Sequence, residues 1–327
     1  MPRHPRDVLF ADEKPFPALP TVVHYAGTEK RLKKALALQR EFGAVFDVAA
    51  DCEDGATAGA EAEHAAMCAA FVAGADNAFG RVGTRIHDVT HPHWRGDLEI
   101  LVAQSGDRLA FVTFPKPRGA ADVATQLAAL RELEARHGVA RPIPVHVLIE
   151  THGALREVWQ IAALPGVESL DFGLMDFVSA HHGAIPVSAM TSPGQFEHPL
   201  VARAKIEIAA AALAHGVVPT HNVTTDLSDP QAAFLDARRA RAEFGYLRMW
   251  SIHPDQILPI IEAMRPDHSE AGEAAAILVA AQDADWGPIK HKGKLHDRAS
   301  YRYYWTVLER AHSTGMALDD EVVRRFL

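Results

Sequence analysis

The stretch Pro144-Val145-His146-Val147-Leu148-Ile149-Glu150-Thr151 has the composition of a buried strand that ends in a carboxylate. Its aliphatic residues supply both faces of the strand, which is typical of a parallel strand covered on both sides. A buried carboxylate costs free energy unless it is paired or binds a metal. We therefore interpret Glu150, where the strand should stop, as a residue of a functional site.

A second stretch of the same kind follows, Ser169-Leu170-Asp171-Phe172-Gly173-Leu174-Met175-Asp176. We expect it to be the next strand and to deliver Asp176 beside Glu150. Two carboxylates, waters and substrate oxygens make a typical Mg²⁺ site, because Mg²⁺ prefers oxygen ligands and keeps several waters. The two stretches predict that Glu150 and Asp176 bind one divalent cation. The alternative is that one of these carboxylates caps the helix that follows it.

The composition narrows the class of protein. The chain has 327 residues, of which 48% are hydrophobic, and a net charge of -9. This length fits one barrel-sized domain or two smaller domains, and the acidic charge argues against a general nucleic-acid binder. We expect no signal peptide and no membrane span, because the sequence has neither an apolar leader nor a run of about 18 apolar residues. Only two cysteines are present, Cys52 and Cys68, which favours a reducing compartment, and we expect a cytoplasmic protein.

Strand and helix patterns alternate eight times along the chain. We expect strands at residues 21–26, 45–51, 81–87, 109–116, 144–150, 169–176, 217–223 and 247–253. Helix-start signals follow some of these strands, such as Thr28 and the pair Asp229-Pro230. The alternation predicts a (β/α)₈ TIM barrel. A doubly wound open sheet is the competitor, but it would have a glycine-rich phosphate turn after the first strand, where this chain has a lone Gly27.

We expect three segments: an N-terminal arm at 1–20, the TIM barrel at 21–265 and a C-terminal helical extension at 266–327. Within the extension, helices are expected at about 271–284 and 301–312. A structured tail after a barrel is either a lid or an oligomer arm.

Barrel active sites lie at the carboxyl ends of the strands. In this chain nearly every strand end carries a group able to do chemistry, which a structural barrel would not need. These groups are Asp51, Glu53, Asp54, Arg85, His87, Lys116, Glu150, Asp176, His221, Asn222 and His253. The pattern predicts an enzyme.

Arg85 and Lys116 are the cations of this set. The guanidinium fork of Arg85 suits bidentate binding of a substrate carboxylate. An internal ion pair with Asp51, Glu53 or Asp54 is the alternative, and both can hold, because an acidic partner can orient the arginine. Lys116 can neutralise a substrate phosphate or carboxylate, or it is an exposed lysine of the barrel rim. At least one of the three acids is expected in a solvated loop.

Other chemistries find less support. The pair His91-x-His93 lacks the remaining spacings of a zinc site. Cys52 has no evident base nearby in the sequence and fits a small buried residue better than a nucleophile. We find no nucleophile elbow and no phosphate-binding P-loop.

The strand ends together resemble the citrate lyase β-subunit and malyl-CoA lyase family, within the pyruvate-utilising aldolase superfamily. The similarity runs from about residue 20 to residue 312 and rests on seven motifs in order. They are Asp51-Cys52-Glu53-Asp54-Gly55, Thr84-Arg85-Ile86-His87, Phe114-Pro115-Lys116, Ile149-Glu150-Thr151, Phe172-Gly173 followed by Asp176, Ser251-Ile252-His253-Pro254-Asp255-Gln256-Ile257, and Gly293-Lys294-Leu295-His296-Asp297.

The resemblance implies a Mg²⁺-dependent carbon–carbon lyase. Such an enzyme cleaves or forms a hydroxyacyl-CoA-type thioester, such as citryl-, malyl- or citramalyl-CoA, through an acyl thioester enolate and a 2-oxo acid. By resemblance, Glu150 and Asp176 would be the metal ligands, and Arg85, with Glu150 and Lys116, would bind the substrate. Asp297 would match an acid that some members insert into a neighbouring subunit's site as acid/base. A homo-oligomer is also implied, and trimers are common in the family.

Three positions depart from the family pattern. The first strand, within 20–27, lacks the arginine of the family's Arg-Ser-x-Leu-Phe-x-Pro-Gly run. His87 stands for the usual Asn, and His221-Asn222 stand for an Ile-Asp pair. Two alternatives therefore stay open. One is a metal-dependent aldolase that acts on free 2-oxo acids without CoA, and the other is a non-catalytic carboxylate-binding relative.

Overall fold

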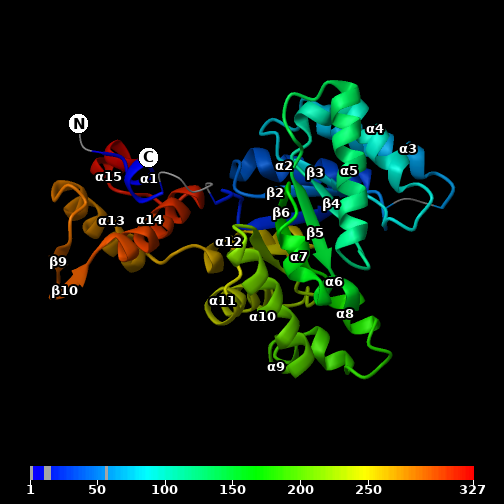
Figure 1. The fold of residues 1–327 in the computed structure, drawn as a ribbon. Coiled ribbons are helices and arrows are strands. Elements are labelled where there is room, and N and C mark those ends of the chain that lie inside the picture. Colours follow the sequence, from blue (N-terminus) through cyan, green and yellow to red (C-terminus); the bar gives the residue numbers. More distant parts are fainter. Residues whose placement is uncertain (1–2, 11–15, 56–57) are drawn as a thin grey trace. The chain divides into compact units, whose positions relative to one another are not determined.

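The structure is a computed structural model that describes residues 3–10, 16–55 and 58–327. The chain forms two compact units (Figure 1). One is Leu19–Met264, and the other combines Met1–Ala18 with Arg265–Leu327. Of the expected N-terminal arm, residues 1–2 and 11–15 lie outside the described residues.

Eight parallel strands close the first unit into a barrel. They follow the chain order from β1 to β8, and β8 pairs with β1. The strands are β1 (Val22–Ala26), β2 (Asp47–Asp51), β3 (Val82–Arg85), β4 (Val112–Phe114), β5 (Val145–Ile149), β6 (Val167–Phe172), β7 (Val218–His221) and β8 (Arg248–Ser251). The predicted (β/α)₈ barrel is confirmed, and the open sheet is excluded.

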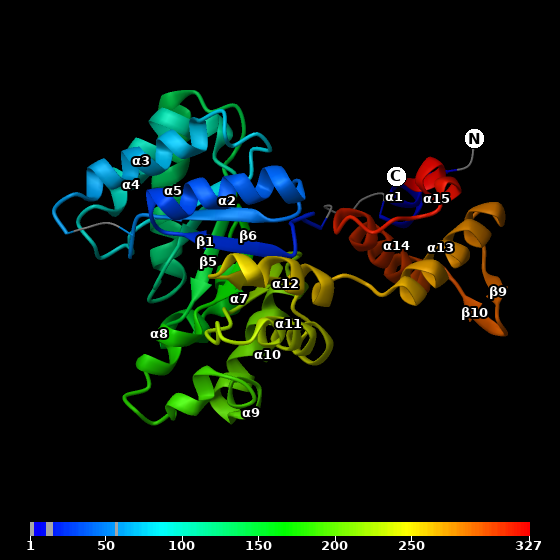
Figure 2. The ribbon, with the colours of Figure 1, turned by 180° about the vertical axis from the view of Figure 1, so that it is seen from behind.

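Helices surround the strands, as Figures 1 and 2 show. Each strand is followed by at least one helix before the next strand begins. The longer ones are α2 (Glu29–Phe42), α3 (Glu61–Ala73), α4 (Trp94–Ser105), α5 (Ala120–His137), α10 (Pro199–Ala214), α11 (Pro230–Phe244) and α12 (Ile257–Met264). The shorter ones are α6 (His152–Arg156), α7 (Val158–Ala162), α8 (Leu174–Ser179), α9 (Gly194–Glu197) and the 3₁₀ turns η1 (Gly106–Arg108), η2 (Val187–Met190) and η3 (Pro254–Gln256).

Local sequence signals fix several helix ends. The Thr28 hydroxyl accepts a hydrogen bond from the backbone N–H of Arg31, and the Asp229 carboxylate accepts one from Gln231, so both are the expected N-caps. Helix α5 ends at Gly138, whose φ of 68° is in the left-handed region that favours glycine.

One expectation about the elements is wrong. The predicted sixth strand does not reach Asp176, because β6 ends at Phe172 and helix α8 begins directly after Gly173. The apolar residues of the predicted strand continue into α8, where they form a buried helix face. Apolar composition alone therefore cannot distinguish a buried strand from a buried helix at this point.

Large and small side chains alternate in the barrel interior. Val23, Ala49, Phe111 and Trp250 form one buried cluster there. A Cβ at Gly83 would lie 2.5 Å from the Phe111 ring, so glycine makes room for that ring. The interior is therefore a packed core rather than a channel.

The strand register brings the carboxyl ends of the strands together. Asp51 at the end of β2 lies opposite Arg85 at the end of β3. A buried ion pair between Arg248 and Asp47 lies at the opposite end, where β2 and β8 begin. That end of a TIM barrel contributes to stability, whereas the carboxyl end holds the chemistry.

The second unit is helical with one hairpin. It contains α1 (Pro5–Leu9), α13 (His268–Asp283), α14 (Arg298–Ser313) and α15 (Asp320–Phe326), and its core includes Ile277, Leu278, Tyr301 and Trp305. The hairpin of β9 (Ile289–His291) and β10 (Lys294–His296) was not predicted. Its turn, Lys292-Gly293, has positive φ at both residues, which suits a tight two-residue hairpin.

Among the described residues, no helix is both long and apolar enough to cross a membrane.

Candidate active site at the carboxyl ends of the strands

Arg85 is the centre of an acidic cluster. Its Nε and Nη2 donate to the two carboxylate oxygens of Asp51, each at 2.8 Å, and Nη2 also donates to Asp54 at 2.7 Å. Nη1 lies 2.9 Å from Glu53 Oε2. The predicted internal ion pair is therefore present with all three acids. Only Nη1 makes no hydrogen bond to the described residues, so little of the guanidinium group is left for a substrate.

The three acids differ in environment. Asp51 is fully buried, whereas the Asp54 side chain is 64% exposed, as expected for one acid in a solvated loop. Burial alone would raise the pKa of Asp51, but hydrogen bonds from Arg85 and Tyr25 lower it overall. Burial raises the pKa of Glu53. Asp54 is thus the partner of Arg85 that a ligand can displace most readily.

Lys116 joins this cluster to the predicted metal ligands. Its Nζ donates to Glu53 Oε1 at 2.7 Å and lies 3.9 Å from Asp176 Oδ1, while its backbone N–H donates to Glu150 Oε1 at 2.8 Å. Its φ of 48° is in the left-handed region, which is unfavourable for a residue with a side chain. Lys116 is therefore no free rim lysine, because both its backbone and its side chain hold carboxylates of the site.

Glu150 is 3% exposed at the end of β5. Burial, followed by repulsion from Asp176, raises its pKa to about 8. Its Oε1 accepts a hydrogen bond from the Lys116 backbone N–H. Its Oε2 accepts no hydrogen bond from the described residues, yet it is not sealed from solvent. One oxygen of this carboxylate is thus available to a ligand.

Asp176 lies in the first turn of helix α8, not at a strand end, and its side chain is 51% exposed. It is still close enough to Glu150 for the two charges to repel each other. The capping alternative is wrong for both carboxylates. The Thr151 hydroxyl caps α6, and no side chain in the described part of the chain caps α8.

The described residues contain no group of three or more His, Cys, Asp or Glu side chains arranged to hold a metal ion. A pair of carboxylates nonetheless suits Mg²⁺, which fills its other positions with waters and substrate oxygens. The available oxygen of Glu150 and the repulsion between Glu150 and Asp176 fit a bound cation, because a cation would relieve that repulsion.

Several other strand-end residues have their side chains held by partners outside this site. His221 and Asn222 are buried against the amine of Lys205 from α10. His87 pairs with the carboxylate of Asp97 at 2.6 Å. His253 caps η3. Cys52 is fully buried, as the sequence predicted, and both cysteines are free thiols.

Three residues of the site were missed by the sequence analysis. The Tyr25 hydroxyl donates to Asp51 Oδ2 at 2.9 Å, and His64 Nε2 contacts the backbone oxygen of Asp51 at 2.8 Å. A Cβ at Gly173 would lie 2.1 Å from Glu150 Oε2. Tyr25 has a signal in the sequence, because it alternates with the inward-facing Val23. Nothing in the sequence marks His64.

A cavity of about 350 Å³ lies beside the acidic cluster. The loops and helices after β1 and β2 line it, with Thr28, Glu29, Gly55, Ala60, Glu63, His64 and Met67. Gly55 follows Asp54 directly, so this cavity adjoins the exposed side of the Arg85 cluster.

Gly173→Ala tests the close approach of α8 to Glu150. The backbone conformation of Gly173 suits alanine (φ -94°), so any cost comes from the contact with the Glu150 carboxylate. We expect a loss of about 1–3 kcal/mol in the free energy of unfolding, together with weaker metal binding. Gly272→Ala is the matched control, because a Cβ there meets no atom of residues 3–10, 16–55 or 58–327 within 4 Å. That change in α13 should stabilise by about 0.5–1 kcal/mol. Chemical denaturation measures both, and equal effects would contradict the close approach.

The chain is similar to several known proteins. The profile of the family described as HpcH/HpaI aldolase/citrate lyase matches residues 33–254. L-malyl-CoA/beta-methylmalyl-CoA lyase of Cereibacter sphaeroides (strain ATCC 17029 / ATH 2.4.9) is 29% identical over 274 residues, covering 80% of this chain and 86% of that protein. Malyl-CoA/beta-methylmalyl-CoA/citramalyl-CoA lyase of Chloroflexus aurantiacus is 27% identical and covers 69% of each chain.

Solved structures show the same fold. A citrate lyase from Burkholderia xenovorans LB400 is 52% identical over the full length of both chains, with a TM-score of 0.86. The protein CitE of Mycobacterium tuberculosis, in complex with magnesium, acetoacetate and coenzyme A, is 22% identical. It has a TM-score of 0.67 over 90% of this chain and 99% of that chain.

Proposed function

Because the chain belongs to the HpcH/HpaI aldolase/citrate lyase family, we propose that it is a Mg²⁺-dependent lyase of hydroxyacyl-CoA-type thioesters. Malyl-, citramalyl- and citryl-CoA are the candidate substrates, and the products would be an acyl thioester and a 2-oxo acid. Relatives of the chain are named lyases, so it is an enzyme of the carbon–carbon lyase type. One observation supports the proposal most: Glu150 and Asp176, with oxygens free to bind, lie beside Lys116 and the Arg85 cluster.

Glu150 and Asp176 would hold the metal, and waters would complete its shell. When bound, Mg²⁺ would act as a Lewis acid toward the carbonyl and carboxylate of the 2-oxo acid. The CitE structure contains magnesium and coenzyme A, which supports both ligands here by analogy.

The charges of the site suggest an order of binding. Five carboxylates and two cations, all described above, give a formal charge of -3 when every group is ionised. Such a site attracts a divalent cation and repels a 2-oxo acid anion. The metal would therefore bind first, and the oxo acid would bind well only afterwards.

Arg85 would bind the substrate carboxylate at the position held by Asp54, the most exposed of its carboxylate partners. Asp51 would keep the guanidinium group in place meanwhile, because its carboxylate binds two nitrogens of Arg85. The Tyr25 hydroxyl would in turn hold Asp51. A positioned cation of this kind stabilises negative charge that develops during cleavage. The cavity next to Gly55 would accept the thioester arm.

Asp297 remains a proposed acid/base, contributed by a neighbouring subunit of a homo-oligomer. In the second unit its Oδ1 caps α14 by accepting from Ala299 and Ser300, and Oδ2 accepts no hydrogen bond from the described residues. The cap fixes the carboxylate and leaves one oxygen available.

Calorimetric titration of the wild-type protein tests the proposal. We expect Mg²⁺ to bind alone, and oxaloacetate, glyoxylate or pyruvate to bind only when Mg²⁺ is present. Incubation of the best oxo acid with acetyl-CoA or propionyl-CoA should then yield the condensed thioester, detected by mass spectrometry. Absence of any Mg²⁺-dependent binding would refute the metal site.

A second candidate is an aldolase that acts on free 2-oxo acids without CoA. The first strand favours it, because β1 carries His24 and Tyr25 and no arginine for a CoA phosphate. Metal-dependent binding of an oxo acid, without measurable affinity for CoA or its thioesters, would favour this candidate over the lyase. Tight binding of carboxylates without turnover of any substrate would instead indicate the non-catalytic relative.

A further inference from the structure

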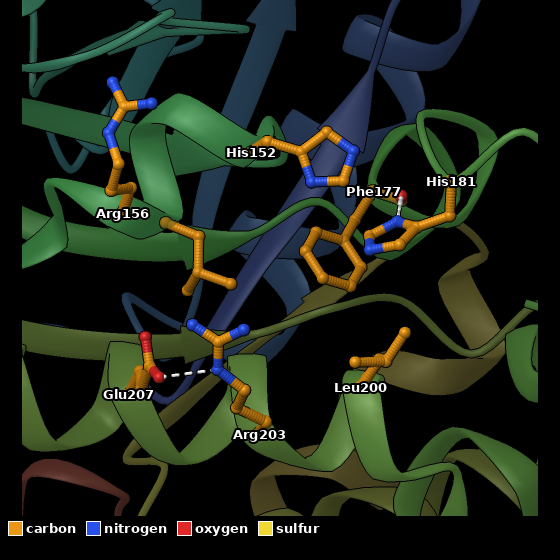
Figure 3. A pocket seen from close by; sticks show the side chains of 8 residues that line it. His152, Arg156, Phe177, His181, Leu200, Arg203 and Glu207 are labelled. Atoms are coloured by element: carbon orange, nitrogen blue, oxygen red, sulfur yellow. Dashed lines mark hydrogen bonds and ion pairs between the residues drawn. The ribbon is translucent and has the colours of Figure 1, made fainter.

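A second cavity, of about 200 Å³, lies on the barrel unit between helices α6, α8 and α10. Figure 3 shows the side chains that line it, among them His152, Phe177, His181, Leu200 and Arg203. None of the residues assigned to the active site lines this cavity. Its volume corresponds to roughly six or seven water molecules, which suits a small metabolite.

Two cations, Arg203 and Arg156, and one carboxylate, Glu207, line the cavity, which leaves it a net positive charge. The Nε of Arg203 donates to Glu207 Oε1 at 2.8 Å, one turn along α10. The guanidinium group of Arg203 is thus ion-paired with Glu207, but its two terminal nitrogens make no hydrogen bond with the described residues. Figure 3 shows the guanidinium group pointing away from its own helix, whereas that of Arg156 lies apart at the edge of the view. One guanidinium edge with free N–H groups is therefore presented, and such an edge binds carboxylates in bidentate fashion.

Two histidines line another side of the cavity in fixed orientations. His152 Nε2 contacts the backbone oxygen of Ala180 at 3.0 Å, and His181 Nδ1 contacts that of Phe177 at 2.6 Å. Because a carbonyl only accepts, each of these nitrogens carries the proton. The other nitrogen of each ring has no partner among the described residues and is not sealed from solvent.

The three remaining lining residues, Leu155, Phe177 and Leu200, are apolar. Leu155 and Phe177 are buried beneath the cavity, and Leu200 is 38% exposed at its rim. A purely ionic ligand such as phosphate would leave these surfaces unused. A ligand with one carboxylate and a short hydrocarbon chain would satisfy both Arg203 and the apolar side chains.

We propose that this cavity binds a small carboxylate anion with a short apolar chain, held by the free edge of Arg203 and packed on Phe177. The site goes beyond the proposed lyase activity. It nevertheless shares secondary structure with the lyase site, because Phe177 directly follows Asp176 and His152 comes two residues after Glu150.

Calorimetry with butyrate tests the proposal, in EDTA so that no metal occupies the active site. We expect butyrate to bind in the millimolar range and the uncharged isostere butyramide to bind at least about 10-fold more weakly, since a charge-assisted pair is lost. Arg203→Gln should weaken butyrate binding about 10-fold or more. Arg239→Gln is the matched control, because Arg239 makes the same pair with a glutamate four residues on but lies outside the cavity; it should have no effect.

The imidazole NMR signals of His152 and His181 locate the ligand independently of affinity. Butyrate should shift both signals in the wild type and in Glu150→Gln, and neither in Arg203→Gln. Because Glu150→Gln removes the proposed metal ligand, this result separates the cavity from the lyase proposal. Equal binding of butyrate and butyramide, equal loss in both arginine variants, or no shift of either histidine would each overturn the assignment.

Discussion

Replacing Glu150 with Gln is expected to abolish Mg²⁺-dependent binding of 2-oxo acids and, at the same time, to stabilise the metal-free protein. Gln keeps an oxygen that can accept from the Lys116 backbone but removes the charge. Loss of a direct ligand should exceed the about 10–100-fold cost known for outer-shell partners of a metal. A residue that lowers stability while it enables binding is the signature of a functional position.

The sign of the stability effect follows from the pKa of Glu150. Burial and Asp176 raise this pKa from 4.5 to about 8 in the folded protein. The unfolded chain therefore gives up this proton more readily, so the metal-free protein loses stability as pH rises from about 4.5 to about 8. The full loss is at most ~5 kcal/mol, at 1.36 kcal/mol per unit of pKa. Glu150→Gln should remove this slope, and saturating Mg²⁺ should reduce it in the wild type only.

Urea denaturation at pH 5 and pH 8.5, with and without Mg²⁺, measures this effect. Glu168→Gln is the control. Glu168 is a partly buried glutamate on the neighbouring strand, β6. Burial alone would raise its pKa, but the hydrogen bond with His146 lowers it overall. Glu168→Gln should destabilise the protein and keep Mg²⁺ binding, whereas Glu150→Gln should stabilise the metal-free protein and abolish Mg²⁺-dependent binding. If Glu150→Gln instead destabilised the metal-free protein at pH 8.5, the charge of Glu150 would not be what lowers the stability of the wild type.

The sequence predicted the barrel because its strands are buried on both faces and end in polar residues. It also placed Glu150 and Arg85 at strand ends, as the structure does, because the core of a barrel covered on both sides rejects a charged residue within a strand. The position of Asp176 could not be predicted. Gly173 ends β6 to make room for the Glu150 carboxylate, a contact between residues 23 positions apart.

The same limit explains His221 and Asn222. His221 ends β7 and Asn222 follows it, so both lie at a strand end as the catalytic candidates do, yet a buried lysine on α10 binds their side chains. Lys205 looks in the sequence like an ordinary polar residue of a helix, although it is fully buried. Which strand-end residues point into the barrel depends on the local register at each strand end, and the sequence does not fix that register to within one residue.

Replacing Arg85 with Gln is expected to have the largest effect on stability. Asp51 and Glu53 would remain in a largely buried cluster without their shared cation, since the Arg85 side chain itself is only 13% exposed. Removing one partner of a buried ion pair costs about 3–5 kcal/mol, because the remaining charge is left uncompensated. Lys116 would hold Glu53 but does not contact Asp51 in the structure. Substrate turnover should also fall about 10²–10³-fold, as expected for loss of one positioned charge donor.

The pH dependence separates this mechanism from a loss of packing. In the wild type, bonds from Arg85 and Tyr25 hold the pKa of Asp51 below its ordinary value despite burial. That contribution is present above the unfolded pKa of 3.8 and is lost as pH falls through the lower, folded value. In Arg85→Gln the buried carboxylate would instead favour its protonated form. The difference in unfolding free energy should therefore be widest at neutral pH and should narrow below about pH 4.

Two further variants complete the test. Arg85→Lys restores one charge but cannot reproduce the two parallel bonds to Asp51, so it should recover stability more than turnover. Arg81→Gln is the control, because Arg81 directly precedes the same strand. Its side chain is 33% exposed and lies 3.4 Å from Asp47, which also pairs with Arg248. Its loss should cost no more than ~1 kcal/mol. A difference between Arg85→Gln and wild type that stayed constant from pH 7 to pH 3 would show that packing, rather than the carboxylates, sets the cost.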